Sequence, residues 1–176
     1  NKSLWVTPFM NFDFSDDHKE LREQAQRFLR DRCTPKAVRR ILEGGDTYDR
    51  ELWKGVAEMG WTATVIPEEF GGLGLGYLEL CVIAEELGRV VAPIPFASSV
   101  YLATEAILLA GSAEQKAKYL PKLASGEAIG AFAIAEGAGA ATPRTVRTTL
   151  KGGKLDGTKV PVADGNVADF AVVLAR

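Results

Sequence analysis

The side chains that most often carry catalysis are scarce in this sequence. It contains one histidine, His18, and two cysteines, Cys33 and Cys81. A single histidine makes a histidine-based triad unexpected and excludes a histidine-rich metal site. Two cysteines in a chain of this length indicate neither a disulfide framework nor a zinc site, so we expect two buried thiols in a reducing cytosol. His18 follows two aspartates near a helix start, and we expect it to be solvated.

Glycine recurs in the run Phe70-Gly71-Gly72-Leu73-Gly74-Leu75-Gly76. These glycines do not follow the G-x-x-x-x-G-K-[ST] spacing of a phosphate-binding loop, and no basic residue follows closely. Four glycines within six positions also disfavour an ordered helix. We therefore predict a structural loop in which Gly71 and Gly72 need a backbone conformation with positive φ.

The composition is that of an ordinary globular protein. Of the 176 residues, 47% are hydrophobic and 25% are charged, and the formal net charge is −2. A net negative chain argues against a nucleic-acid surface, which is normally basic. No apolar run approaches the ~20 residues that a membrane span needs. These observations predict a cytoplasmic protein with no membrane span and no nucleic-acid partner.

The pattern of the chain changes near residue 126. Before that point apolar residues recur at helical spacing, and we expect helices over roughly 16–33, 35–43, 50–59, 78–90, 97–110 and 113–123. After it come short strands around 131–135, 145–150, 155–162 and 170–174, separated by glycine turns. Helices followed by strands indicate the α+β class: an all-α bundle, then the first strands of an antiparallel β-domain.

We divide the chain into three parts. Residues 1–10 form a leader or tag-like segment, residues 11–126 a helical domain, and residues 127–176 part of a β-domain. Met10 is a candidate for the natural start. Four strands make a poor independent sheet, so the β-domain is expected to continue beyond Arg176.

Four passages carry a family resemblance. They are Asn11-Phe12-Asp13-Phe14-Ser15 before an amphipathic helix, Ile66-Pro67-Glu68-Glu69-Phe70-Gly71-Gly72-Leu73-Gly74, Lys118-Tyr119-Leu120-Pro121-Lys122-Leu123-Ala124-Ser125-Gly126-Glu127, and Gly157-Thr158-Lys159 with Ala168-Asp169-Phe170 after it. Each passage alone is a modest signal. In this order and spacing they extend from Phe12 to Arg176 and resemble the acyl-CoA dehydrogenase family.

The resemblance implies a partial chain of a three-domain fold whose C-terminal helical bundle is absent from this sequence. It implies FAD-dependent α,β-dehydrogenation of an acyl-CoA thioester, in fatty acid or sterol side-chain catabolism. In the family that bundle supplies the carboxylate base, so no catalytic residue is assigned here and the chain alone is expected to be inactive. Glu136 lies near the implied flavin in the sequence, but a local ion pair or loop bond is its better interpretation. The implied partners are an electron-transfer flavoprotein or similar acceptor and the other subunits of a homo- or hetero-tetramer.

By resemblance, the flavin lies against the strand that ends at Glu136 and against the small-residue loop after it. The implied cofactor-binding positions are Phe132, Ile134, Ala135, Ala140, Ala141, Val160 and Val162. Ala135 stands where the family has threonine, and the family's G-S-D becomes Gly139-Ala140-Ala141-Thr142 with an ambiguity of one residue. Its W-[IL]-[TS] element reads Val160-Pro161-Val162. Because these hydroxyls are missing, the flavin would be held by backbone N–H groups and by shape.

The acyl tail is implied to lie between two central helices. The substrate-binding positions are Ser98, Ser99 and Leu102, with Ala141 beside the substrate linker. Small residues there indicate room for branched or polycyclic acyl groups. Simple core packing of an apolar helix is the competing interpretation of the same positions.

The departures from the flavin motifs leave two functions open. One is a divergent acyl-CoA dehydrogenase that still binds FAD. The other is a non-catalytic partner subunit of a heteromeric acyl-CoA dehydrogenase that has lost its flavin. A third interpretation, an unrelated helical interaction module, is disfavoured because it would make the motifs of the β part a coincidence.

Overall fold

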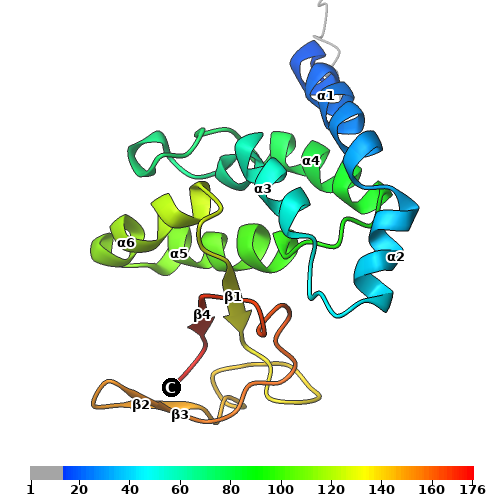
Figure 1. The fold of residues 1–176 in the computed structure, drawn as a ribbon. Helices are drawn as coiled ribbons and strands as arrows, with labels where there is room; N and C mark the ends of the chain where they lie inside the picture. Colours follow the sequence, from blue (N-terminus) through cyan, green and yellow to red (C-terminus); the bar gives the residue numbers. More distant parts are fainter. Residues whose placement is uncertain (1–13) are drawn as a thin grey trace, which may run out of the picture.

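A computed structural model describes residues 14–176. The helices are α1 (Asp16–Arg32), α2 (Pro35–Glu43), α3 (Arg50–Glu58), α4 (Tyr77–Arg89), the π-helix η3 (Ala97–Thr104), α5 (Glu105–Ala110) and α6 (Ala113–Ala124), with 3₁₀ turns at Trp61–Ala63 and Glu68–Phe70. The strands are β1 (Gly130–Ala133), β2 (Thr149–Lys151), β3 (Lys154–Asp156) and β4 (Phe170–Val173). The expected leader and the opening motif up to Asp13 lie outside the described residues. The α+β class is confirmed: the helices lie together, with α3 and α4 above α5 and α6, and the strands lie below α5 (Figure 1).

Side-chain caps set the helix starts that the sequence predicts. The hydroxyl or carboxylate of Ser15, Thr34, Asp49 and Ser112 accepts a hydrogen bond from a backbone N–H in the first turn of α1, α2, α3 and α6. Each bond satisfies a donor that the helix itself leaves unpaired. Pro35 occupies the first turn of α2, where its missing N–H costs nothing, so it restarts the helix as predicted.

Helix α1 packs along α4, and one carboxylate is buried at this contact. The Glu86 side chain is 1% exposed. It accepts hydrogen bonds from Arg22 at 2.9 Å, from Gln26 at 3.2 Å and from Arg89 at 3.1 Å. A buried charge needs such partners, because an unpaired one is strongly destabilising.

Two expectations about single side chains, those for His18 and Cys81, are wrong. His18 is not solvated: its Nε2 lies 2.9 Å from Oε1 of Glu79 and its Nδ1 lies 2.6 Å from Oγ of Ser15. Its partner comes from α4, far along the chain, so local sequence could not reveal it. Cys33 is buried as expected, and this burial, followed by the nearby Asp49 charge, raises the pKa of its thiol. Cys81 is exposed, which corrects the expectation of two buried thiols.

The glycine-rich loop is ordered by close backbone contact. Gly71 has φ +79°, as predicted. Gly72 does not have a positive φ; instead a Cβ there would lie 1.8 Å from the carbonyl oxygen of Ile66. Hydrogen bonds from Leu73 N to Ala63 O and from Leu75 N to Thr64 O, at 2.9 and 2.8 Å, hold the loop against the preceding turn. The loop is therefore structural in the sense predicted, but the two glycines are needed for different reasons.

The helix predicted over 97–110 begins as a π-helix. Two buried serines on it reach the strand region: Oγ of Ser99 accepts from Gly130 N at 3.2 Å, and Oγ of Ser98 donates to Oδ2 of Asp164 at 2.5 Å. Gly130 has no room for a side chain, since a Cβ there would lie 2.5 Å from Cβ of Ala103. Strand β1 thus packs closely on the small side chains of η3.

The strands form two pairs. β2 and β3 form the predicted antiparallel hairpin, and Gly152 and Gly153 in its turn have positive φ angles of 56° and 74°. β1 and β4 pair in parallel, from Gly130 opposite Phe170 to Ala133 opposite Val173. The expectation of antiparallel pairing throughout is wrong for this pair. A long connection over residues 134–169 returns the chain to the starting end of β1, which allows a parallel partner.

We predict that Gly72→Ala destabilises the helical layer, because its new Cβ meets the Ile66 carbonyl. The cost is that of overpacking, about 1–3 kcal/mol or more. Gly88→Ala is the matched control: nothing lies within 4 Å of its Cβ position, and alanine is the better helix former. Urea denaturation followed by circular dichroism measures both. Equal midpoints for the two variants would contradict the prediction.

Candidate functional site

A pocket of about 210 Å³ opens where β1 ends. It is lined by Ile134, Glu136, Gly137, Ala138, Gly139, Ala140, Ala141, Thr145, Val146 and Arg147. Three of the positions implied for flavin, Ile134, Ala140 and Ala141, are among these. Phe132 is half-buried in β1, two residues before Ile134, and does not line the pocket. The structure therefore brings the strand end and the small-residue loop of the sequence prediction to one place.

A second segment joins this strand end through backbone bonds. Val160 N donates to Ala135 O at 2.8 Å, and Gly137 N donates to Val160 O at 2.8 Å. Ala135 and Val160 are thus direct neighbours. The Val160–Pro161 peptide is cis, and Val162, half-buried beyond it, does not line the pocket.

Backbone donors at the strand end are open. Within residues 14–176, the N–H groups of Ile134, Ala135 and Glu136 donate to no acceptor, and neither do those of residues 138–141. Gly137 and Gly139 have φ angles of 107° and 108°, a conformation that other residues rarely adopt. Such a run of N–H groups suits the acceptor atoms of a ring edge or a phosphate.

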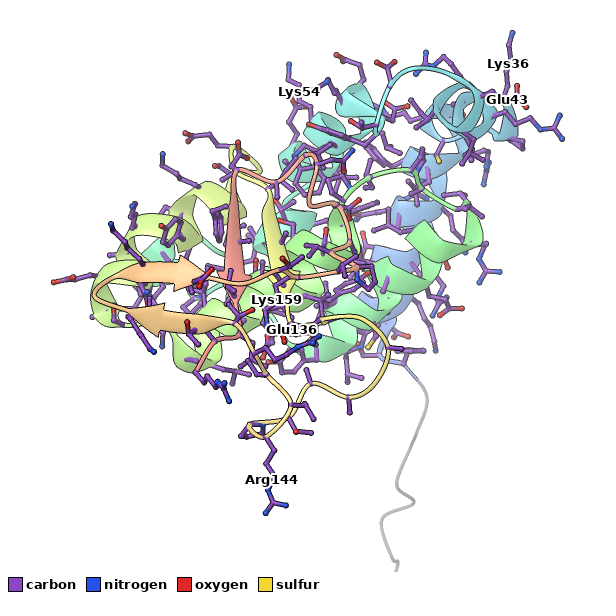
Figure 2. The ribbon with its side chains drawn as sticks, turned by 90° about the horizontal axis from the view of Figure 1, so that it is seen from below. Lys36, Glu43, Lys54, Glu136, Arg144 and Lys159 are labelled. Atoms are coloured by element: carbon purple, nitrogen blue, oxygen red, sulfur yellow. The ribbon has the colours of Figure 1, made fainter. Side chains whose placement is uncertain are left out.

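The Glu136 side chain is saturated by neighbours within the chain. Oε1 accepts from Lys159 Nζ at 2.8 Å, from Thr148 N at 2.8 Å and from Thr148 Oγ1 at 2.6 Å. Oε2 accepts from Arg147 N at 2.7 Å, and Arg147 Nε lies 3.6 Å away. Figure 2 shows Glu136 and Lys159 pointing toward each other, while Arg144 projects away from them.

These contacts settle what Glu136 can do. The hydrogen bond from Lys159, followed by those from Thr148 and Arg147, holds the pKa of Glu136 far below the usual glutamate range. A carboxylate so held is a poor proton acceptor, so Glu136 is not suited to be a base. The local ion pair predicted from the sequence is confirmed. Sequence reasoning missed its partners Thr148 and Arg147, and the only available signal was the lysine of the Gly157-Thr158-Lys159 motif.

Three of the four positions implied for substrate lie on η3 and do not line the pocket. Ser98 and Ser99 are buried, and their hydroxyls are used in the bonds to Asp164 and Gly130. Leu102 is 43% exposed on η3, and Ala141 is exposed in the loop of the pocket. The structure does not gather these four residues around one cavity.

Two further properties bear on the class of protein. In the part of the chain that the structure describes, no helix is long and apolar enough to cross a membrane. Among these same residues, no group of three or more His, Cys, Asp and Glu side chains is arranged to hold a metal ion.

Comparison with known proteins shows the family of the chain. Residues 15–127 match the family model described as "Acyl-CoA dehydrogenase, N-terminal domain". The chain belongs to the acyl-CoA dehydrogenase family. It is 32% identical to isovaleryl-CoA dehydrogenase, mitochondrial, from Solanum tuberosum, over 93% of this chain and 41% of that protein. It is 33% identical to an acyl-CoA dehydrogenase of Bacillus subtilis, over 88% of this chain and 42% of that protein.

Solved structures share the fold, among them an acyl-CoA dehydrogenase. One from Bacillus anthracis, complexed with FAD, is 31% identical with a TM-score of 0.81, over 93% of this chain and 29% of that chain. The ChsE4-ChsE5 complex from Mycobacterium tuberculosis is 30% identical with a TM-score of 0.82, over 95% of this chain and 46% of that chain. The chain thus spans about two fifths of the length of the curated relatives that it matches.

We predict a pH dependence from the lowered pKa of Glu136. Its contribution to the free energy of unfolding is complete above the unfolded glutamate pKa of about 4.3 and is lost as the pH falls through the lower folded value. Glu136→Gln should therefore be less stable than wild type near neutral pH, with a difference that shrinks below about pH 4. Urea midpoints measured across this range test it. A difference that stays constant with pH would show that the charge of Glu136 is not responsible.

Proposed function

We propose that this chain is the N-terminal part of an FAD-dependent acyl-CoA dehydrogenase that performs α,β-dehydrogenation of an acyl-CoA thioester. The observation that carries the proposal is the row of open N–H groups at Ile134, Ala135 and Glu136, at the rim of a pocket in a chain of this family. Bound FAD would supply the hydride acceptor for the β-hydrogen of the substrate.

The residues present fit such a cofactor by backbone and shape. The N–H groups of residues 134–136 suit the polar edge of the isoalloxazine, with Phe132 and Val160 as apolar neighbours and Val162 two residues further along the chain. The loop through Ala140 and Ala141 brings its open N–H groups close to a phosphate, since no larger side chain intervenes. The role of the chain is to bind and orient the ring, and its own hydroxyls take little part.

The proton of the substrate would be removed by a group outside these residues. The carboxylate nearest the pocket, Glu136, is saturated by Lys159, Thr148 and Arg147. We therefore assign the base to the part of the protein that corresponds to the remaining length of its relatives.

The acyl tail would pass along the exposed side of η3. Leu102 contributes the apolar contact, and Ala141 lies beside the linker. Ser98 and Ser99 set the position of the helix against β1, and their small side chains leave room for a branched or polycyclic group.

Electrons would pass to an electron-transfer flavoprotein or a similar acceptor. The protein would act in the cytoplasm as a homo- or hetero-tetramer. One solved neighbour is named for the electron transferring flavoprotein of Acidaminococcus fermentans.

A second function is favoured by one observation. The positions implied for hydroxyl contacts are Ala135, Ala141 and Val162, and none of these side chains carries a hydroxyl. A chain with this set suits a non-catalytic partner subunit that has lost its flavin and completes the assembly of a heteromeric dehydrogenase. One solved neighbour is a complex of two differently named chains.

Flavin content decides between the two functions. We predict that the complete protein, purified with any partner subunit, absorbs in the flavin bands with one FAD per copy of this chain. Anaerobic addition of an acyl-CoA substrate should bleach these bands. One FAD for every two different chains would favour the partner-subunit function, and a colourless preparation that cannot be reconstituted with FAD would contradict both the cofactor and the reaction.

We predict that Leu102→Trp reduces kcat/KM for long or branched acyl-CoAs more than for short ones. A bulkier side chain fills the space that the tail needs, and a pocket change of this size alters discrimination by roughly tenfold or more. Leu42→Trp is the control, since Leu42 is an exposed leucine on the distant helix α2. Equal losses for all chain lengths would place the tail elsewhere.

A further inference from the structure

Two separate segments meet at the strand end beside the candidate flavin pocket, and one carboxylate joins them. The first is the strand end with its loop, residues 134–141, and the second is the passage through Lys159 and Val160. Glu136 lies on the first and Lys159 on the second, with side chains only 11% and 8% exposed. Lys159 Nζ also donates to the Ile134 carbonyl at 3.3 Å, so it contacts the pocket wall itself.

The carboxylate also fixes a third segment, the approach to the β2–β3 hairpin. It accepts from the backbone N–H groups of both Arg147 and Thr148, while the Arg147 guanidinium donates to the Glu136 carbonyl at 3.2 Å. A carboxylate offers about four acceptor sites, and here all its neighbours are donors. An amide of the same shape would turn its NH₂ group toward a donor in either orientation.

We infer that Glu136 and Lys159 are positioning residues that hold the flavin-facing backbone in place and set the charge beside the flavin. This inference rests on the proposed function. The pair brings one negative and one positive charge to the pocket wall and is neutral as a unit. Neither residue needs to contact the reacting atoms, because each acts through the segment that it holds.

The pair makes a prediction that loss of rigidity alone cannot imitate. In Glu136→Gln the Lys159 ammonium is left without its counter-charge, and a nearby cation favours the electron-rich reduced flavin. In Lys159→Met the carboxylate loses its nearer cation and keeps only Arg147 at 3.6 Å, so the charge beside the flavin becomes more negative and disfavours the reduced flavin. The midpoint potential of the bound flavin should therefore rise in the first variant and fall in the second, whereas both variants should bind FAD more weakly.

The experiment uses the complete protein with any partner subunit. The variants are Glu136→Gln, Lys159→Met, the double variant, Lys159→Arg and Thr148→Val, which removes only one donor to Oε1. Glu86→Gln is the matched control, since Glu86 is a buried, arginine-paired carboxylate in the helical layer away from the pocket. FAD affinity is measured by fluorescence titration and the midpoint potential by dye equilibration.

The expected results follow from the contacts. Glu136→Gln and Lys159→Met each leave a buried partner unpaired, so each should weaken FAD binding roughly 5- to 150-fold. The potentials should shift in opposite directions, the double variant should lie near wild type in potential, and Lys159→Arg should recover most of both properties. Thr148→Val, which keeps the charge pair, should keep the wild-type potential, and Glu86→Gln should lower only the stability.

Two failures can be told apart. If wild type binds FAD but the two single variants shift the potential in the same direction or not at all, the inference is overturned and the proposed function stands. If wild type cannot bind FAD, the proposed function and the inference fall together. If Glu136→Gln does not fold, the two lysine variants still test the inference. The midpoint potential should fall in Lys159→Met and return toward wild type in Lys159→Arg.

Discussion

The close packing of β1 on the π-helix is the contact on which the rest of the structure depends. Gly130 lies so near Ala103 that a methyl group would not fit between them, and its N–H is held by the Ser99 hydroxyl. This contact fixes the first strand against the helical layer. β4 then pairs with β1, and its Phe170 ring packs against Tyr119 of α6 with centroids 4.5 Å apart. The contacts of Gly130 and Ser99 therefore determine where the strand end with the candidate pocket lies.

Beyond this strand, polar contacts hold the backbone of the pocket in place. Beyond Ala133 the chain leaves the β1–β4 ladder, and the strand end is held by the Val160 backbone and by the Glu136 carboxylate. Much of this wall consists of small residues, which contribute little packing of their own. A saturated carboxylate can replace the order that larger side chains would give, because its hydrogen bonds fix the backbone N–H groups of Arg147 and Thr148 and the side chains of Thr148 and Lys159. The absence of hydroxyls at Ala135 and Ala141 is thus compatible with a well-defined site.

Sequence reasoning succeeded where the physical cause is local. The helix ranges and the glycine turn between β2 and β3 depend on residues within one or two turns, and these were predicted. It failed where the cause is distant in sequence. The partner of His18 is 61 residues away on α4, and the partners of Glu136 that were missed, Arg147 and Thr148, are 11 and 12 residues away. The parallel direction of β4 depends on the path of residues 134–169 as a whole. The pocket positions came from family resemblance, since alanine and valine carry no chemical signal.

The two thiols differ in a way that makes the helical layer observable. Cys81 is exposed on α4, whereas Cys33 lies just past the end of α1 with its Sγ donating to the Val90 carbonyl at 3.7 Å. A maleimide reagent would modify the first thiol in the native protein and reach the second only when the end of α1 separates from α4. Mass spectrometry can count one or two labels per molecule over time. The slower labelling rate then reports how often this part of the native layer opens without complete unfolding.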